Sequence, residues 1–356
     1  MTATLVAGVI AAAQAVFLLV LLLLIAARRG WDHSRRVALA TQRAALVGPL
    51  RDWLVADGAA RDVVSVLVRL PSASTVTAAS LLMRTVVPAE RRPELAALLR
   101  AEPRLQQSVR NATSRWWWRR IEAARALSVV ATPDDRATVQ RLLDDPQPEV
   151  AVSAVACMPL VADKRMIDRE LDRYATLTPM MRQYLLATLR DLPRLVEPAL
   201  VGRLRADAEP RALAERVRLA ALLELPRALE ASVALAAHEH PEVRAAVAFA
   251  LRHLPREASL QRLALLLTDG VPAVREEAAA SLGALASPRA VAVLEAATRD
   301  TDWKVRRRAG LALAQLGDTG REAVRSLRTD PDRYVSSMAT IVSGLSEGAL
   351  LELTEN

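Results

Sequence analysis

Cysteine, glycine and aromatic residues are scarce in this chain of 356 residues. Its single cysteine, Cys157, excludes an intramolecular disulfide framework and a cysteine-based zinc site. With 12 glycines and 3% aromatic residues, beside 52% hydrophobic residues that are mainly alanine and leucine, the composition argues against β-sheets. Alanine and leucine favour closely packed helices, so the composition predicts an all-α protein.

Lysine is also nearly absent. Only Lys164 and Lys304 are lysine among the 48 basic residues, which indicates the codon usage of a GC-rich, bacterial genome. The net charge of +8 is uneven, because residues 28–128 hold 18 basic and 8 acidic side chains and the remainder holds 30 basic and 32 acidic. Phosphate binding requires basic side chains collected along the contact surface, so the slightly acidic remainder argues against nucleic acid as a partner.

An apolar run occupies residues 4–27, with Gln14 as its one polar residue. About 20 helical residues cross a bilayer core, so the run predicts a single transmembrane helix. A cleaved signal peptide would carry positive charge before its apolar core, whereas here the basic residues follow it. The positive-inside rule then places Met1 outside and the bulk of the chain in the cytoplasm, at the inner membrane.

The membrane flank predicts contact with anionic lipid, worth about 1 kcal/mol for each basic residue near the surface. Its members are Arg28, Arg29, Trp31, Arg35 and Arg36, with the tryptophan as an interfacial anchor. Within the run, Ala7, Ala11 and Ala15 repeat a small residue every four positions, which allows close approach of another transmembrane helix. A plain anchor and a helix with an integral membrane partner both fit this spacing.

Residues 31–114 are helical in pattern but irregular. Helices are predicted near 34–56, 59–70, 74–87 and 91–101, with a short one before Asn111. This region is either a set of diverged repeats or a separate helical cap. The predicted domains are therefore the anchor with its flank (1–30), this region (31–114) and a regular array (115–356).

The array is defined by an apolar stripe that recurs every 29 to 32 residues. In one copy, Val305, Ala309, Ala312, Leu313 and Leu316 fall at i, i+4, i+7, i+8 and i+11, on one face of a helix. The first stripe residues, or anchors, are Arg119, Val150, Met181, Leu213, Val243, Val274, Val305 and Tyr334. A fixed period of this length is typical of a solenoid.

Each anchor helix is expected to begin at N-cap or first-turn residues and to be followed by a second helix of about ten residues. The proposed cap and first-turn residues are Asp145-Pro146, Thr178-Pro179, His240-Pro241, Asp269, Asp300 and Asp330-Pro331. The second helices are predicted near 134–144, 163–175, 194–206, 227–237, 257–268, 288–299, 320–329 and 346–353.

These copies resemble HEAT-like repeats, in particular the short bacterial form that also occurs in phycobilin lyases. The resemblance lies in the pattern Asp-x-x-x-x-Val-Arg-x-x-Ala-x-x-x-Leu, as in Asp269 to Leu282 and Asp300 to Leu313, and it covers about 115–354. It implies a right-handed α-solenoid of about eight clear repeats, plus diverged N-terminal helices, behind one transmembrane helix. The concave face of such an array is lined mostly by the second helices.

The resemblance also implies a ladder of Asp–Arg pairs between neighbouring repeats. The ladder should be interrupted where Ala151 follows Val150, and again in the copy at Tyr334. Arg306 is interpreted as a ladder residue and Trp303 as repeat packing. Lys304, Arg307 and Arg308 are interpreted as a solvated flank.

Catalytic and metal-binding residues find little support in the sequence. His238, His240 and His253 lie close together, but no Asp, Cys or His set with metal-ligand spacing accompanies them. No phosphate-binding glycine loop or hydrolase motif occurs, and Cys157 falls at a small, packed position of its stripe. The sequence therefore predicts no catalytic residue, no cofactor and no metal.

The run Trp116-Trp117-Trp118-Arg119-Arg120 is the most unusual stretch outside the apolar segment. Consecutive helix residues lie about 100° apart, so at least one tryptophan should point away from the core. The run either closes the junction with the irregular helices, binds a protein partner, or contacts lipid headgroups.

Together these features predict a membrane-tethered, non-catalytic scaffold that binds a protein partner. That partner is plausibly an integral membrane protein of envelope polysaccharide synthesis or transport. A ligand-binding enzyme or maturation factor of the phycobilin-lyase type is the first alternative, and a nucleic-acid-binding HEAT-like protein is the second.

Overall fold

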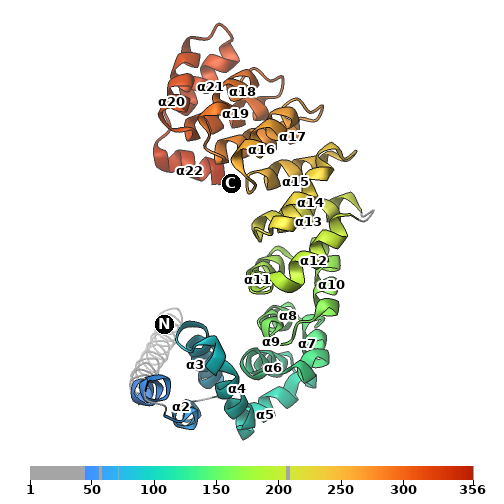
Figure 1. Cartoon of the computed structure of the whole chain (residues 1–356), viewed down its shortest axis with the longest axis vertical. Helices are drawn as coiled ribbons and strands as arrows, with labels where there is room; N and C mark the ends of the chain where they lie inside the picture. The colour runs from blue at the N-terminus through green and yellow to red at the C-terminus, as the bar shows by residue number, and fades with distance from the viewer. Residues whose placement is uncertain (1–44, 56–57, 71, 206–208, 356) are drawn as a thin grey trace, which may run out of the picture. The chain divides into compact units, whose positions relative to one another are not determined.

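A computed structural model describes residues 45–55, 58–70, 72–205 and 209–355 (Figure 1). Its regular elements are all helical, with no strand among the residues described, which confirms the predicted all-α class. The predicted transmembrane run 4–27 lies outside these ranges, as do Arg28, Arg29, Trp31, Arg35 and Arg36. Within the ranges, no helix combines the length and the apolar character needed to cross a bilayer.

The chain forms two compact units, one up to Cys157 and one from Met158. Their boundary coincides with a break between helix α8 (Pro148–Val155) and the short helix α9 (Met158–Val161). Pro159 has no N–H to donate to the carbonyl of Val155 four residues earlier, so a single helix cannot continue through this point.

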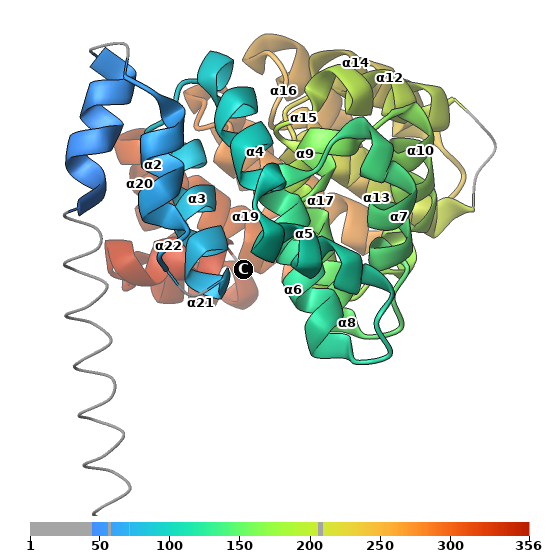
Figure 2. The ribbon, with the colours of Figure 1, turned by 90° about the horizontal axis from the view of Figure 1, so that it is seen from below.

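The first unit begins with the irregular helices, at the places where the sequence predicts them. They are residues 45–55, α2 (Ala60–Leu67), α3 (Ser72–Thr85), α4 (Arg92–Ala101) and α5 (Pro103–Arg110) (Figure 2). Trp53 is buried among them, and its indole Nε1 donates to Glu94 Oε2 at 3.3 Å. The same core includes Ala126, Val129 and Val130 of the first regular helix, so the irregular helices are packed directly onto the array.

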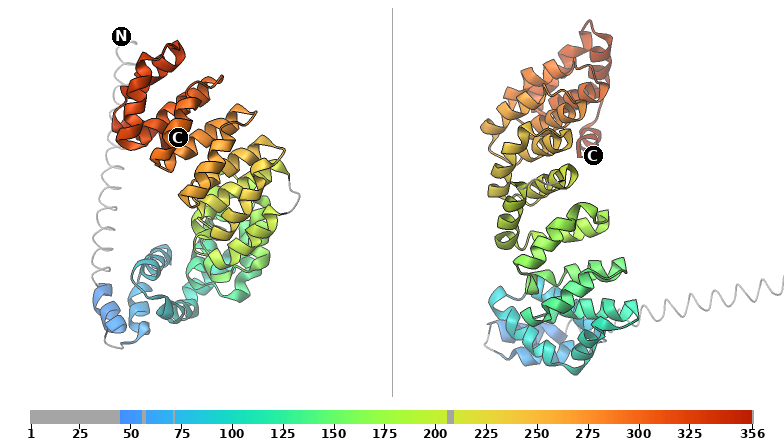
Figure 3. Two further views of the ribbon diagram at one scale, coloured as in Figure 1. Left: turned by 45° about the horizontal axis from the view of Figure 1, so that its top comes forward. Right: turned by 90° about the vertical axis from the view of Figure 1, so that its right-hand side faces the viewer.

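The regular part consists of eight helix pairs among the described residues, as predicted. The first helices are α6 (Trp117–Val130), α8, α11 (Pro179–Leu189), α13 (Pro210–Leu222), α15 (Pro241–Leu251), α17 (Pro272–Ala284), α19 (Trp303–Gln315) and α21 (Arg333–Ser343). The second helices are α7 (Arg136–Leu143), α10 (Lys164–Arg173), α12 (Pro193–Leu204), α14 (Pro226–Val233), α16 (Arg256–Leu266), α18 (Val291–Ala297), α20 (Gly317–Ser326) and α22 (Glu347–Glu355). Figure 3 shows the pairs of the second unit stacked side by side.

Helix starts reveal a period more regular than the anchors do. From α6 to α19 every first helix begins 31 residues after the previous one, and the last interval, from Trp303 to Arg333, is 30. Five of these helices begin with proline, whose fixed φ suits the first turn and whose missing N–H costs nothing there. The proline therefore marks the start of these five repeats.

The predicted stripes form the core of the array. Val274, Ala278 and Leu282 of α17 are fully buried, as are Val305, Ala309 and Leu313 of α19. Two anchors are wrong. Tyr334 is exposed and its neighbour Val335 is buried in its place, because the repeat that begins with α19 is one residue shorter, and Arg119 is exposed at the start of α6.

First helices of neighbouring repeats approach closely through small residues. A Cβ atom added at Gly283 of α17 would lie 2.9 Å from Cα of Ala312 in α19, closer than packed carbon atoms can come. Gly310 of α19 leaves room for the thioether of Met338 in α21. The absence of a side chain at these two glycines is thus what allows the helices to approach so closely.

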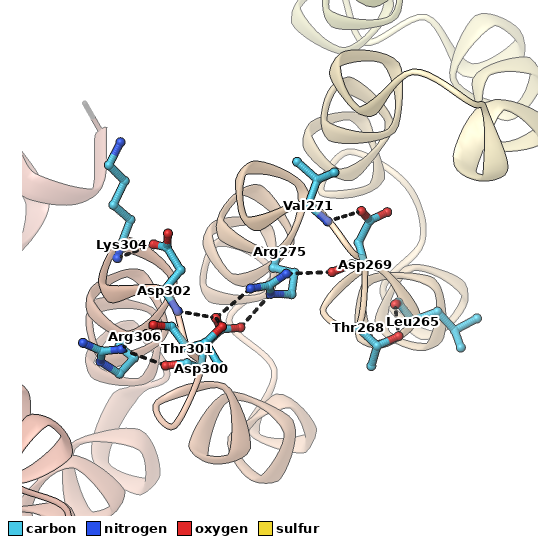
Figure 4. Close-up of polar contacts among 10 residues, drawn as sticks. All are labelled: Leu265, Thr268, Asp269, Val271, Arg275, Asp300, Thr301, Asp302, Lys304 and Arg306. Atoms are coloured by element: carbon cyan, nitrogen blue, oxygen red, sulfur yellow. Dashed lines mark hydrogen bonds and ion pairs between the residues drawn. The ribbon is translucent and has the colours of Figure 1, made fainter.

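The predicted Asp–Arg ladder is present in three rungs of the same geometry, one of which Figure 4 shows. Arg275 of α17 donates from Nε and Nη2 to the two carboxylate oxygens of Asp300, at 2.7 and 2.8 Å, and from Nη1 to the carbonyl of Asp269 in the turn before α17. Matching rungs join Arg244 to Asp269 and Arg120 to Asp145. Each rung therefore fixes one first helix to the turn before the next.

The ladder aspartates do not cap helices, which corrects the role predicted for them. Asp145, Asp269 and Asp300 each accept the backbone N–H two residues later, at 2.8 to 2.9 Å, and so close the turn that precedes the N-cap residue. Side-chain capping comes from other residues, such as Thr178 before α11 and Asp302 before α19.

The ladder is interrupted at the two predicted places, where Ala151 and Ser336 stand in place of arginine, and also in α13, where Leu213 does. Arg306 departs from the pattern in another way. It donates to the carbonyls of Asp300 and Thr301, but the residue 25 positions later is Pro331, and its guanidinium lies 5.2 Å from the centroid of the Tyr334 ring instead.

The rungs should make stability depend on pH. The pKa of Asp269 lies below its usual value, because the hydrogen bond from Arg244 outweighs the effect of burial. Burial opposes ionisation more strongly at Asp300, yet the hydrogen bonds from Arg275 and from the backbone of Asp302 still hold its pKa low. Such groups stabilise the fold fully above their unfolded pKa of about 3.9.

We therefore expect the free energy of unfolding to fall as pH drops below about 4, through the lower pKa values of the folded state. Urea unfolding followed by circular dichroism at neutral pH and at about pH 3 measures this loss. A chain carrying Asp269→Asn and Asp300→Asn should be less stable at neutral pH but lose less on acidification. An unchanged acid loss in that chain would assign the effect to other groups.

Candidate partner-binding site

The sequence-predicted site lies where α6 begins. Trp116 is the N-cap residue of that helix and Trp117 its first residue, so three successive side chains point in different directions from the first turn. The rings of Trp116 and Trp118 are stacked at 4.6 Å between centroids, and that of Trp117 meets Trp118 edge-on at 6.1 Å. Trp116, Trp117 and Trp118 are named here the tryptophan cluster.

All three rings of the tryptophan cluster face solvent, with 39%, 43% and 45% of their surfaces exposed. They are not part of the buried core that α6 shares with the irregular helices. That core is filled from the other end of α6, by Ala126, Val129 and Val130.

The arginines beside the cluster have different roles. The Arg115 guanidinium stacks over the Trp116 ring at 4.7 Å, and Arg119 is exposed. Arg120 is committed to the ladder, with Nε 2.6 Å from Asp145 Oδ2, and this ion pair raises its pKa despite burial. The site thus presents three aromatic rings and two accessible guanidinium groups.

The other residues considered as catalytic or metal-binding candidates are Cys157 and the histidines. Cys157 is buried, its thiol donates to the carbonyl of Ala124 at 3.2 Å, and burial raises the pKa of the thiol far above its usual value. Burial also lowers the pKa of His253, whose ring lies 5.8 Å from that of Phe249. Within the described ranges, no group of three His, Cys, Asp or Glu side chains could hold a metal ion.

Two residues of the array were assigned wrongly from the sequence. Trp303, expected to pack between repeats, is 57% exposed, and Arg308, expected to be solvated, is partly buried and donates to the carbonyl of Leu353 in α22. The exposed Tyr334 was taken for a buried anchor. The signal that could have revealed both aromatics is their position just before the first buried stripe residue of a helix.

Comparisons with known proteins concern the fold. Residues 261–344 match the family model of HEAT repeats, whereas no curated protein sequence matches the chain. An engineered protein of known structure is 19% identical, with 77% of this chain and 84% of that chain covered and a TM-score of 0.33. Kap121p, in its complex with Nup53p, is 12% identical, with 88% of this chain and 40% of that chain covered and a TM-score of 0.48. YibA of Escherichia coli is 15% identical, with 73% of this chain and 99% of that chain covered and a TM-score of 0.33.

The matched segment runs from α16 to α21 and contains the rung between Arg275 and Asp300. The 31-residue spacing of helix starts continues on its N-terminal side as far as α6, and rungs of the same kind recur at Arg244 and at Arg120. Residues 261–344 therefore consist of HEAT-type repeats, and the helix pairs on their N-terminal side share the same repeat length.

Proposed function

We propose that this protein is a non-catalytic scaffold that binds a protein partner through the tryptophan cluster and is tethered to the inner membrane by residues 4–27. The observation that carries the proposal is the exposure of three adjacent tryptophans on a helix of the solenoid. Each ring presents a large apolar surface whose burial by a partner would be favourable.

The geometry of the cluster favours a protein partner. Stacking between Trp116 and Trp118, and of Arg115 on Trp116, holds the side chains in place before binding, so that little conformational entropy is lost on association. Tryptophan and arginine are the residue types that most often dominate the binding energy of protein interfaces. The apolar run and its basic flank support the tether and a partner in the same membrane.

Affinity capture from membranes solubilised in mild detergent tests this function. The full chain should retain a partner, and a chain with Trp117→Ala and Trp118→Ala should retain it at least about tenfold less tightly, as expected for hot-spot residues. Because the two rings are half exposed, this chain should unfold at the temperature of the wild type. A chain lacking residues 1–30 should move from the membrane fraction to the soluble fraction.

Tyr184→Ala on α11 is the matched control, since Tyr184 is similarly exposed at 52% but lies outside the tryptophan cluster. It should leave capture unchanged. A partner held equally by the tryptophan variant and the wild type would move the binding site elsewhere on the solenoid, and the absence of any captured protein would overturn the scaffold function.

A further inference from the structure

A second exposed aromatic surface lies in the last repeats, where α19 and α21 begin. Trp303 is the first residue of α19, and Tyr334 is the second residue of α21 and 53% exposed. The guanidinium of Arg307 lies 5.9 Å from the Trp303 ring centroid, and that of Arg333 lies 4.7 Å from the centroid of Tyr334. Together with Arg306 these residues are named the aromatic–arginine ledge.

The ledge exists because the repeat that begins with α19 is one residue shorter than those before it. In the regular rungs, arginines 120, 244 and 275 each bind the aspartate 25 residues later. After Arg306 the shorter repeat moves that aspartate to position 330, where it pairs with Arg299. Arg306 is thereby released from the ladder and lies beside Tyr334 instead.

The nearby carboxylates are already occupied. Asp302 accepts the backbone N–H of Lys304, and Asp332 accepts that of Tyr334, both at 2.8 Å. Asp300 binds Arg275. Among the described residues, no carboxylate lies within ion-pair distance of Lys304, Arg306, Arg307 or Arg333. Figure 4 shows the Lys304 side chain extending away from the rung.

The ledge thus combines exposed aromatic rings with cations that lack an anionic partner. A guanidinium stacked on a ring keeps its N–H edge free for a carboxylate, which it can bind through two parallel hydrogen bonds. Tyr334 Oη accepts a hydrogen bond from Arg333 Nη2 at 2.7 Å, which holds that arginine in place. Trp303 and Tyr334 supply the apolar contact that a carboxylate alone would not use.

We propose that the aromatic–arginine ledge binds an acidic, extended segment of a partner protein, with carboxylates on the arginines and an apolar side chain against the rings. A single strand of nucleic acid would also stack on aromatic rings, but it needs cations along the whole path of its backbone. The chain beyond residue 128 has 30 basic and 32 acidic residues, so this cluster is not part of a longer basic surface. This site is separate from the tryptophan cluster and does not depend on the function proposed there.

Fluorescence anisotropy with the full chain in detergent tests the proposal. The probe is a fluorescein-labelled peptide in which two leucines lie within a run of glutamates, and the control peptide has glutamines in place of the glutamates. We expect the acidic peptide alone to bind, with an affinity that falls as salt is raised. A chain with Arg307→Gln and Arg333→Gln should bind it at least about tenfold more weakly, and so should one with Trp303→Ala.

Matched variants separate the ledge from charge in general. Arg262→Gln on α16 removes an exposed arginine from another repeat and should leave binding unchanged, and Trp303→Phe should retain most of it. Equal binding of the glutamine peptide, or equal losses from Arg262→Gln and the ledge variants, would overturn the proposal. Tighter binding of a labelled oligouridylate that displaces the peptide would overturn it in favour of nucleic acid. Loss of the tryptophan cluster should have no effect on this assay.

Discussion

Leu282→Asp is expected to unfold the middle of the second unit while leaving its distant repeats folded. Leu282 is fully buried in α17, between the stripes of α15 and α19, and an aspartate there would place a carboxyl group in an apolar core without a partner. The cost should exceed about 4 kcal/mol. Repeats in a solenoid are stabilised by their neighbours, so the damage should spread to the adjacent pairs first.

Limited proteolysis with mass-spectrometric mapping measures where the chain opens. New cleavage sites should appear near α15 to α18, and the helical circular dichroism signal should fall by only part of its value. Leu265→Asp is the matched control, because Leu265 on α16 is 71% exposed and the same change there should cost little. Uniform protease resistance of the Leu282→Asp chain would contradict a solenoid held together by these stripes.

Arg275→Met should destabilise the protein by about 3 kcal/mol, because it leaves the buried carboxylate of Asp300 without its cation. Arg306→Met provides a comparison at the same place in the next repeat. Arg306 also donates to carbonyls of the preceding turn, but it has no carboxylate partner among the described residues, so its loss should cost only about 1 kcal/mol.

Urea unfolding of both variants gives the difference between these free energies. Adding Asp300→Asn to Arg275→Met should recover part of the loss, since a neutral side chain there no longer needs a cation. Equal effects of Arg275→Met and Arg306→Met would show that the carbonyl hydrogen bonds, rather than the ion pairs, hold neighbouring repeats together.

The repeat period and the buried stripes were predictable from the sequence because they follow from helix geometry alone. Val274, Ala278 and Leu282 have the spacing of one helix face, and packing that face is the main source of stability for a helix pair. The ladder was predicted too, but by the resemblance to HEAT-like repeats. Helix starts were less well placed, because Asp145 and its equivalents look like N-cap residues until the turn between them and the helix is seen.

The exposed aromatics were missed for a physical reason. Tyr334 and Val335 are both apolar enough to serve as an anchor, and only the one-residue shortening of the repeat that begins with α19 decides which of them faces the core. Trp303 occupies the position at which five other first helices have proline, and nothing in its own neighbourhood tells exposure from packing. The tryptophan cluster was recognised because three consecutive tryptophans cannot all be buried by one helix face.

The 31-residue spacing has a consequence for how such a chain can grow. The block from Pro241 to Val271 contains both Arg244 and Asp269, and the block from Pro272 to Asp302 contains both Arg275 and Asp300. Each block begins with its own helix-starting proline and contains both the arginine and the aspartate of one ion pair. Duplicating or deleting one in the gene would therefore lengthen or shorten the protein without leaving a buried charge unpaired, so that repeat number can change in evolution at little cost to folding.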